Sequence, residues 1–320
     1  MMESKVTISE GFLDLLQCPV SSQPVNKMEG GLAVINSPVR YRINAKGIPL
    51  FAENLCSNDA RRQEVHYDRI AQKYLVNLAY PHTQEYMRYL DEAFLEEIKD
   101  TNLGTCAEIC CGGAEAFQLL ASRVKRGIGI DVSVAMLEAA RARFPSTSYL
   151  FVQGDATLLP LCSNVLDSAF ILGGIHHVND RVKLFQEVFR VLKPGGKLYW
   201  REPVSDFFFW RWLRAIIYRI SPTLDSETER PLRYRETETP LKMAGFRLKS
   251  WKTFGFFGYC LLMNSDVLVF NRLLRFLPGI RLLTRYTTML DDWTVRLPGM
   301  GGYGLIVVGV AEKPVKGAVP

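Results

Sequence analysis

Apolar segments of strand length alternate with helical segments along residues 105–202, and this alternation limits the possible folds of the chain more than any other feature. The strand-like runs cover residues 105–110, 127–130, 148–153, 168–172 and 197–202, and the helical patterns between them cover 114–124, 134–143 and 181–191. Strands that alternate with helices predict an α/β fold, in which a parallel sheet carries helices on both faces. Ligands of such sheets bind at the carboxyl ends of the strands, so we expect a site at that edge.

The alternating segment is flanked by regions of different character, which predicts three parts: residues 1–60, 61–206 and 207–320. Helical patterns over 65–78 and 84–98 precede the first strand. We expect a small β-rich domain first and the core of the sheet second. The third part should hold the rest of the sheet, with inserted helices that form a cap over the site.

Composition places the chain among ordinary globular proteins, because 48% of its residues are hydrophobic and 22% are charged. These values exclude a disordered chain and a fibre. The seven cysteines form no spaced framework, and the N-terminal MMESKVTISE is polar, unlike a secretory leader. We therefore predict free thiols and a cytoplasmic location.

The net charge of +6 is concentrated in the C-terminal third. Residues 206–320 hold 17 Lys and Arg against 10 Asp and Glu, whereas residues 1–205 hold 22 against 23. The apolar runs at 253–271 and 207–220 are not expected to cross a membrane, because the first contains Asp266 and is followed by Arg272, and the second carries three arginines. Residues 207–220 and 267–286 are expected to fold as amphipathic helices of the cap. Two interpretations stay open: an ordinary hydrophobic cap with a solvated basic face, or a surface that contacts a membrane peripherally and admits a lipophilic acceptor.

Three motifs at the predicted carboxyl ends of the strands suit a nucleoside-containing ligand. The first strand runs into Gly112 and Gly113, where a sharp turn lets a ligand approach the backbone and the start of a helix. Asp131 ends the second strand, nineteen residues after Gly112, where dinucleotide folds place an acid on ribose hydroxyls. Asp155 and Ala156 follow the third strand. A dehydrogenase is disfavoured, because the chain has no Tyr-x-x-x-Lys pair.

The order of these motifs resembles a class I S-adenosylmethionine-dependent methyltransferase of the type 11 small-molecule group. The resemblance covers about residues 66–204 and rests on five successive motifs: AEICCGGAEA, GIGIDVSVAMLEAARAR, FVQGDATLLPLCSNVLDSAF, GGIHHV and VLKPGGKLYWREP. Later pieces, ETPLKMAGFRLKSW and GGYGLIVVGVAEK, resemble the last helix and strands of the family. The resemblance implies a doubly wound, seven-stranded, mostly parallel sheet with an antiparallel last strand. It also implies that the chain binds S-adenosylmethionine and releases S-adenosylhomocysteine.

The resemblance places the ribose and methionine parts of this cofactor at the ends of the first two strands. Asp131 would accept hydrogen bonds from the ribose hydroxyls, and Glu108 would lie near the methionine amino group. Gly112 would lie beneath both parts. The glycine-rich loop of the family reads Cys110, Gly112, Ala114 in this chain, so Cys110 adds a side chain where the backbone is tight.

The adenine ring and the methionine carboxylate would lie at the next two strands. Met136 and Val132 would pack on the face of the adenine. Asp155 and Ala156 would bind its edge through a carboxylate and a backbone N–H. Gly173, at the end of the fourth strand, would approach the methionine carboxylate or the sulfonium.

Two histidines and two tyrosines complete the candidates. His176 and His177 follow the fourth strand, where one of them could deprotonate an acceptor, or the pair could only hold the loop. Tyr67 and Tyr74 match the helix that covers the cofactor in the family, but they could equally be core aromatics at helical spacing. Glu202 ends the fifth strand and is interpreted as a structural acid or one close to the cofactor.

The acceptor is predicted to be a small molecule and not a nucleic acid. Amide and base N-methyltransferases carry an Asn-Pro-Pro-Tyr type of motif where this chain reads LGGIH, at residues 172–176. We therefore predict methylation of an oxygen or a carbon on a lipophilic, aromatic or polyketide-like acceptor. The alternative is a protein that keeps the cofactor but acts as a cyclase, an isomerase or a binding module.

The first part of the chain resembles the small zinc-ribbon-like activator domain that partners some methyltransferases. The matching pieces are LLQCPV and YRINAKGIPLF, within a helical turn at 12–16 and strand-like pieces over 18–25, 32–43 and 44–51. The zinc form of that domain needs two cysteine pairs, and only Cys18 is in place. We predict that the domain binds no metal.

Overall fold

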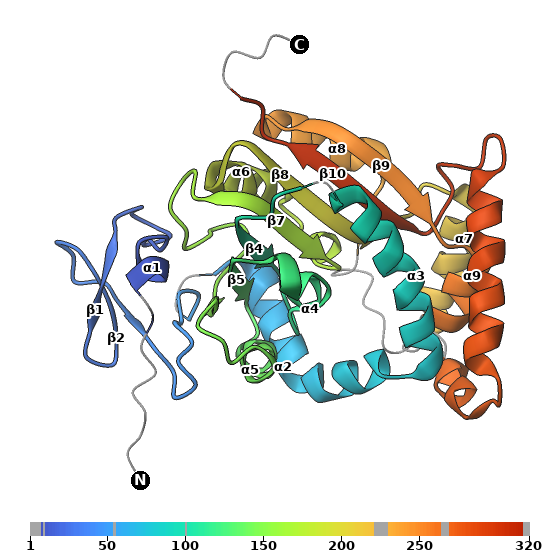
Figure 1. Cartoon of the computed structure of the whole chain (residues 1–320), viewed down its shortest axis with the longest axis horizontal. Coiled ribbons are helices and arrows are strands. Elements are labelled where there is room, and N and C mark those ends of the chain that lie inside the picture. Colours follow the sequence, from blue (N-terminus) through green and yellow to red (C-terminus); the bar gives the residue numbers. More distant parts are fainter. Residues whose placement is uncertain are drawn as a thin grey trace.

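A sheet of seven strands forms the centre of the structure, in the order β6-β5-β4-β7-β8-β10-β9 (Figure 1). This computed structural model describes residue 8 and residues 10–53, 56–99, 101–220, 230–263 and 269–315. The strands are β4 (Thr105–Ile109), β5 (Arg126–Asp131), β6 (Tyr149–Gln153), β7 (Leu166–Leu172), β8 (Leu192–Pro203), β9 (Arg247–Phe254) and β10 (Ile306–Glu312). Strands β4 to β8 pair in parallel, whereas β10 runs antiparallel to β8 and β9. The predicted fold class is confirmed.

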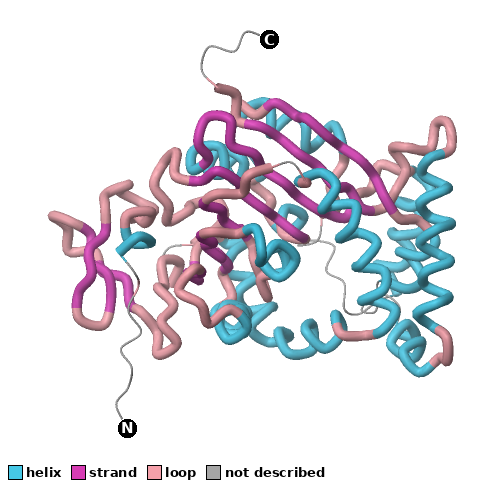
Figure 2. The backbone as a smooth tube through the Cα atoms, in the orientation of Figure 1, coloured by secondary structure: helices cyan, strands magenta, loops and turns pink. Residues whose placement is uncertain are grey.

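The central strands need helices on both faces, because every residue of β4 and of β6 is buried. Figure 2 shows the strands as a central layer with helices on either side. The helices are α2 (Asn58–Leu78), α3 (Pro81–Ile98), α4 (Glu115–Leu120), α5 (Val134–Arg143), α6 (Arg181–Val191) and α8 (Tyr234–Ala244).

Short polar residues determine where the helices begin. Ser57, Ser133 and Asp180 cap α2, α5 and α6, and each side chain accepts a hydrogen bond from a backbone N–H of the first turn. Helices α5 and α6 span their predicted ranges, whereas a 3₁₀ turn ends α4 early. Helix α2 begins seven residues before its predicted start at Val65, and this difference matters for the site.

The first part of the chain forms a small antiparallel sheet of β1 (Val25–Met28), β2 (Gly31–Val34) and β3 (Arg40–Arg42) after a short helix, α1 (Glu10–Leu13). The predicted strand over residues 18–25 is wrong, because only its last residue joins a strand. The N–H of Gln153 donates to the carbonyl of Pro49 over 2.8 Å, and the N–H of Phe51 donates back to Gln153 over 3.0 Å. This part therefore covers the edge of the sheet at β6, where backbone groups would otherwise be unpaired.

Cys18 lies in the core of this small sheet, where its Sγ is 3.1 Å from the hydroxyl of Tyr41. Among the residues that the structure describes, no three His, Cys, Asp or Glu side chains could hold a metal ion together. The absence of zinc stays a prediction for metal analysis of the purified protein.

The C-terminal part adds α7 (Phe208–Ile220), a π-turn η3 (Tyr259–Met263), a 3₁₀ segment η4 (Val269–Phe276) and α9 (Ile280–Arg296). The helix expected over 267–286 is two elements, because Pro278 and Gly279 interrupt it; residues 267 and 268 lie outside the described residues. Helix α9 packs on α3, at the end of the molecule away from the N-terminal sheet (Figure 1). Within the described ranges, no helix is long and apolar enough to cross a membrane.

Candidate active site

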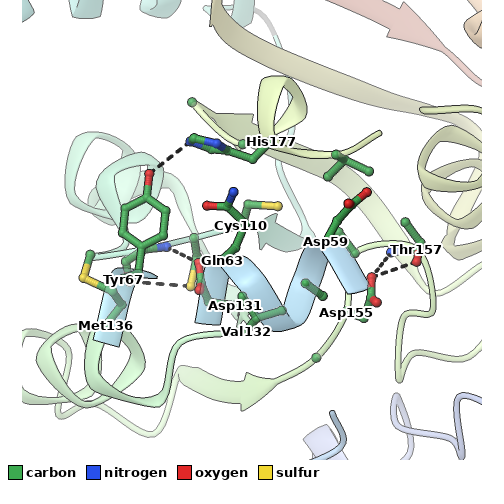
Figure 3. A pocket seen from close by; sticks show the side chains of 18 of the residues that line it. Asp59, Gln63, Tyr67, Cys110, Asp131, Val132, Met136, Asp155, Thr157 and His177 are labelled. Atoms are coloured by element: carbon green, nitrogen blue, oxygen red, sulfur yellow. Dashed lines mark hydrogen bonds between the residues drawn. The ribbon is translucent and has the colours of Figure 1, made fainter. Parts of the chain in front are cut away.

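A pocket of about 810 Å³, partly open to solvent, lies at the carboxyl ends of β4, β5, β6 and β7 beside the first turns of α2 (Figure 3). Parallel strands end at the same edge of a sheet, so residues far apart in sequence meet there. The predicted residues that line it are Tyr67, Cys110, Gly112, Asp131, Val132, Met136, Asp155, Ala156, Gly173 and His177.

Two predicted residues, Glu108 and His176, are not among the described residues that line the pocket. Glu108 is buried behind it, where its carboxylate accepts the backbone N–H groups of Ala116 over 2.9 Å and Phe117 over 3.1 Å. Burial raises the pKa of Glu108 to about 8. Glu108 thus holds the start of α4, and its contact with the methionine amino group stays a prediction. His176 pairs with Glu202, and the side chain of Tyr74 lies outside the described residues.

Asp131 is fixed by two backbone groups at the end of β5. One carboxylate oxygen accepts the N–H of Gly112 over 2.8 Å, and the other accepts the N–H of Ser133 over 2.9 Å. Burial raises the pKa of Asp131, and these hydrogen bonds oppose the rise. A carboxylate has about four acceptor positions, so each oxygen can accept a further hydrogen bond from a ligand. Asp131 is therefore suited to bind a pair of hydroxyls.

The loop after β4 has an unusual backbone at three alternate positions. Cys110, Gly112 and Ala114 have φ of +54°, +47° and +64°, in the left-handed region that favours glycine. The side chain of Cys110 packs against Gly174, where an added Cβ would lie only 2.4 Å from the Cβ of Cys110. The loop therefore accepts Cys110 because the neighbouring residue has no side chain.

Asp155 fastens the start of α2 to the end of β6. Its carboxylate accepts the N–H of Ser57 over 2.7 Å and both the N–H and the hydroxyl of Thr157 over 2.8 Å. Burial raises the pKa of Asp155, but these hydrogen bonds outweigh burial and hold the pKa below its usual value. Asp155 is thus an ionised residue that positions the wall formed by α2.

Gln63 is a lining residue that the sequence analysis missed. It is only 9% exposed, and its Oε1 is buried without a hydrogen-bond donor from the described part of the chain. Figure 3 shows its side chain pointing into the pocket, between Tyr67 and Cys110. Buried polar atoms are rarely left unsatisfied, so an N–H or O–H group of a ligand fits this position.

His177 is the histidine that faces the pocket. Its Nε2 lies 3.0 Å from the hydroxyl of Tyr67, and the two rings meet edge to face. The ring of His176 packs against it, with centroids 3.9 Å apart. His177 is therefore held on two sides, at the rim where an acceptor would enter.

Glu202 organises the turn that carries both histidines. One carboxylate oxygen accepts the N–H groups of Gly174 over 2.6 Å and Ile175 over 2.8 Å, and the other lies 2.7 Å from Nδ1 of His176. Burial raises the pKa of Glu202 and lowers the pKa of His176. His176 and Glu202 thus form a buried pair behind the site.

The pocket fits the cofactor that the sequence motifs imply. Its polar atoms are mainly acceptors, at Asp131 and Gln63, and S-adenosylmethionine offers two ribose hydroxyls and a charged amino group as donors. Val132 and Met136 supply an apolar wall for the adenine ring. Asp131 and Gln63 therefore offer acceptors of the kind that the ribose hydroxyls and the amino group need.

Comparison with known proteins agrees with this description. Residues 107–200 match the family model described as a methyltransferase domain. A 2-phytyl-1,4-naphtoquinone methyltransferase from Nostoc punctiforme is 35% identical over 100 residues, which are 29% of this chain and 44% of that enzyme. The ubiquinone/menaquinone biosynthesis C-methyltransferase from Campylobacter jejuni is 33% identical over 174 residues, which are 47% of this chain and 73% of that enzyme. The chain thus spans less than half the length of the first relative.

Among solved structures, one similar chain belongs to the complex between the Haloferax volcanii Trm112 methyltransferase activator and a methyltransferase. It has a TM-score of 0.52 at 17% sequence identity, and the match covers 80% of this chain and 97% of that chain. At this identity the similarity concerns the fold alone. It supports the sheet topology and says nothing about which partner or acceptor this chain binds.

Proposed function

This chain belongs to the class I S-adenosylmethionine-dependent methyltransferases, and we propose that it methylates a ring carbon or oxygen of a small lipophilic acceptor of the quinone-precursor class. The observation that carries the proposal is the pairing of Asp131 and Gln63 as acceptors in one pocket with an apolar wall. The acceptor class is supported by the two relatives named above, which are quinone methyltransferases.

Each part of the cofactor has a matching group in the pocket. Asp131 would accept the ribose hydroxyls, while Val132 and Met136 would pack on the adenine. The free Oε1 of Gln63 would accept a hydrogen bond from the amino group of the methionine part. Gly173, with φ of +75° and no atom within 4 Å of an added Cβ, leaves room for the ligand at the end of β7.

When bound, S-adenosylmethionine supplies the methyl group, which is carried on a positively charged sulfur. S-adenosylhomocysteine is the leaving group. The chain has to align the acceptor, keep water out and take one proton. His177 is the group placed for the proton, because it lines the pocket and Tyr67 holds its Nε2. Loss of that proton makes a quinol or naphthol ring nucleophilic at oxygen and at the neighbouring carbon.

Acceptors of this class carry long hydrocarbon tails, so peripheral contact with a membrane would bring the chain close to them. The described residues that line the pocket all lie between Ser57 and Val178. The cap expected over the acceptor from residues 207–320 therefore stays a prediction. The same holds for the role of the N-terminal sheet.

The test measures cofactor binding and methyl transfer separately. Calorimetry should detect S-adenosylhomocysteine binding, and Asp131→Ala should weaken it by about tenfold or more, because hydrogen bonds to a charged group contribute about 1.5–3 kcal/mol each. Asp14→Ala is the control and should bind normally, because Asp14 is exposed in the turn after α1. Transfer of labelled methyl to a short-chain 2-prenyl-1,4-naphthoquinol, or to a lipid extract, should require His177.

Two results would contradict the proposal. Unchanged affinity in Asp131→Ala would remove the cofactor assignment. Binding without transfer to any lipid or quinol would favour the alternative of a cyclase, an isomerase or a binding module on the same fold.

A further inference from the structure

Helix α9 exposes most of its large apolar side chains to solvent, whereas three of its five buried residues are polar. The buried positions include Thr284, Thr288 and Asp291, and the carboxylate of Asp291 accepts hydrogen bonds from the hydroxyl of Tyr86 and the N–H groups of Phe257 and Gly258. The exposed apolar residues are Leu282, Leu283, Tyr286, Met289, Leu290 and Trp293. At 100° per residue these six fall within an arc of about 120° on one side of the helix.

The segment before α9 extends this apolar face. Leu273 and Phe276 of η4 and Leu277 after it are exposed, and η4 contacts α9. We call these three residues and the six of α9 the apolar face. Soluble chains rarely expose so many large apolar side chains together, so the face is expected to meet an apolar partner.

Five arginines lie in the segment that carries the apolar face. They are Arg272, Arg275, Arg281, Arg285 and Arg296, all of them exposed. The same segment, residues 269–296, holds only two acids: Asp291 is buried and Asp292 pairs with Arg296 over 2.8 Å. Helix α3 lines a groove beside α9 with Glu92, Glu96 and Glu97, which pair with Arg88, Lys99 and Lys252. Glu85 of α3 is buried and binds Arg285 and Arg88. These acids are thus paired with cations, and residues 269–296, with five arginines against two acids, keep a net positive charge.

We propose that the apolar face docks onto a lipid bilayer with anionic headgroups. Large apolar side chains would enter the boundary of the acyl chains, while the arginines would meet the headgroup phosphates. A second copy of the chain fits less well, because it would bring a second set of five arginines to the interface without adding acids to pair with them. The bilayer is the partner whose charge and polarity both match.

This inference extends the proposed function, since a chain on the bilayer is near acceptors that dissolve there, but the docking itself needs no methyl transfer. Flotation of the full chain with vesicles of phosphatidylcholine and phosphatidylglycerol tests it directly. We expect binding that fades with added salt and is weak on pure phosphatidylcholine.

Matched variants separate the face from the rest of the surface. Met289→Gln with Trp293→Gln should lower the bound fraction about tenfold. Met243→Gln on α8 is the control and should leave the bound fraction unchanged. Met243 is 64% exposed, and Met289 is 63% exposed. Arg281→Glu with Arg296→Glu should also release the chain, whereas Arg235→Glu on α8 should not. Thermal unfolding and S-adenosylhomocysteine binding of each variant show that the fold and the pocket are intact.

Three outcomes would overturn the docking proposal: no flotation of the wild-type chain with anionic vesicles, equal loss in the face and control variants, or a stable dimer that the face variants dissociate. A chain that binds S-adenosylhomocysteine but no vesicles would overturn the docking alone. A chain that binds vesicles but transfers no methyl group would leave docking in place and overturn the proposed function.

Discussion

The hydroxyl of Tyr67 lies 3.0 Å from Nε2 of His177, and this contact joins helix α2 to the turn that follows β7. The same helix is tied to the end of β6, where the N–H of Ser57 donates to Asp155 over 2.7 Å. It is tied to α5 as well, where the hydroxyl of Ser133 donates to Asp68. Helix α2 is therefore a wall of the pocket attached at three points, and its attachments place the groups that would contact the ligand.

Replacing Tyr67 with Phe removes the hydrogen bond to His177 and keeps the ring. We expect cofactor affinity to stay the same, whereas methyl transfer should fall about tenfold or more, because His177 is no longer held toward the acceptor. Calorimetry and a labelled-methyl assay measure the two quantities. Tyr286→Phe, on the exposed side of α9, is the control. A loss of affinity without a loss of transfer would contradict the positioning role of Tyr67.

Gln63→Leu replaces an unsatisfied buried acceptor with an apolar side chain of similar size. The ligand-free chain should be at least as stable as the wild type, because a buried acceptor without a donor costs about 1–3 kcal/mol. Affinity for S-adenosylmethionine should fall about tenfold, because a hydrogen bond from a charged donor is lost. Thermal unfolding with and without ligand measures both, with exposed Gln23→Leu as the control. A fall in stability with affinity unchanged would mean that Gln63 only packs the wall.

Most of the pocket could be predicted because its residues end strands. Asp131, Asp155 and Gly173 each follow a buried apolar run, and parallel pairing brings such ends together whatever the loops between them do. Gln63 could not be found in this way. It lies in the polar stretch NDARRQ at the start of α2, which shows no apolar periodicity, and its burial comes from contact with the ends of other strands. Ser57, a favourable N-cap residue, was the one local signal that helix α2 begins before Val65.

Two further differences have tertiary causes. Glu108 is buried behind the pocket at the motif position expected near the cofactor, because the N–H groups of Ala116 and Phe117 at the start of α4 donate to its oxygens. Helix α9 has an apolar stripe of the kind that usually packs inward, but here this stripe is exposed, and Thr284, Thr288 and Asp291 are buried together with Ile280 and Val295. Sequence spacing identifies a stripe, but it does not say which side of a helix meets the protein.

Substitutions at Gly174 and Cys110 should have coupled effects on the free energy of unfolding. An added Cβ at Gly174 would lie 2.4 Å from the Cβ and 3.0 Å from the Sγ of Cys110, so Gly174→Ala should lower the free energy of unfolding by about 1–3 kcal/mol. Cys110→Gly should be neutral or stabilising, because the backbone there favours glycine. The double variant should be more stable than the two single effects added together. Additive values in urea unfolding would contradict the contact.

The titrations of His176 and Glu202 should have opposite effects on how the free energy of unfolding changes with pH. Burial raises the pKa of Glu202 to about 7 and lowers the pKa of His176 to about 3. Between about pH 4.5 and pH 6.5 the folded chain keeps a proton on Glu202 that the unfolded chain loses, and lacks a proton on His176 that the unfolded chain binds. The two differences cancel, so the pair adds little pH dependence to the stability of the wild-type chain.

Glu202→Gln removes one side of this balance and keeps an oxygen that can accept the N–H groups of Gly174 and Ile175. Below about pH 6.5 the unfolded variant then binds one proton more than the folded variant, so acidification lowers its free energy of unfolding by up to about 1.4 kcal/mol per pH unit. Urea unfolding from about pH 7.5 to about pH 5 measures the slope, with exposed Glu29→Gln as the control. A slope no steeper than that of the wild type would mean that His176 is protonated in the folded chain and that the pair is an ion pair.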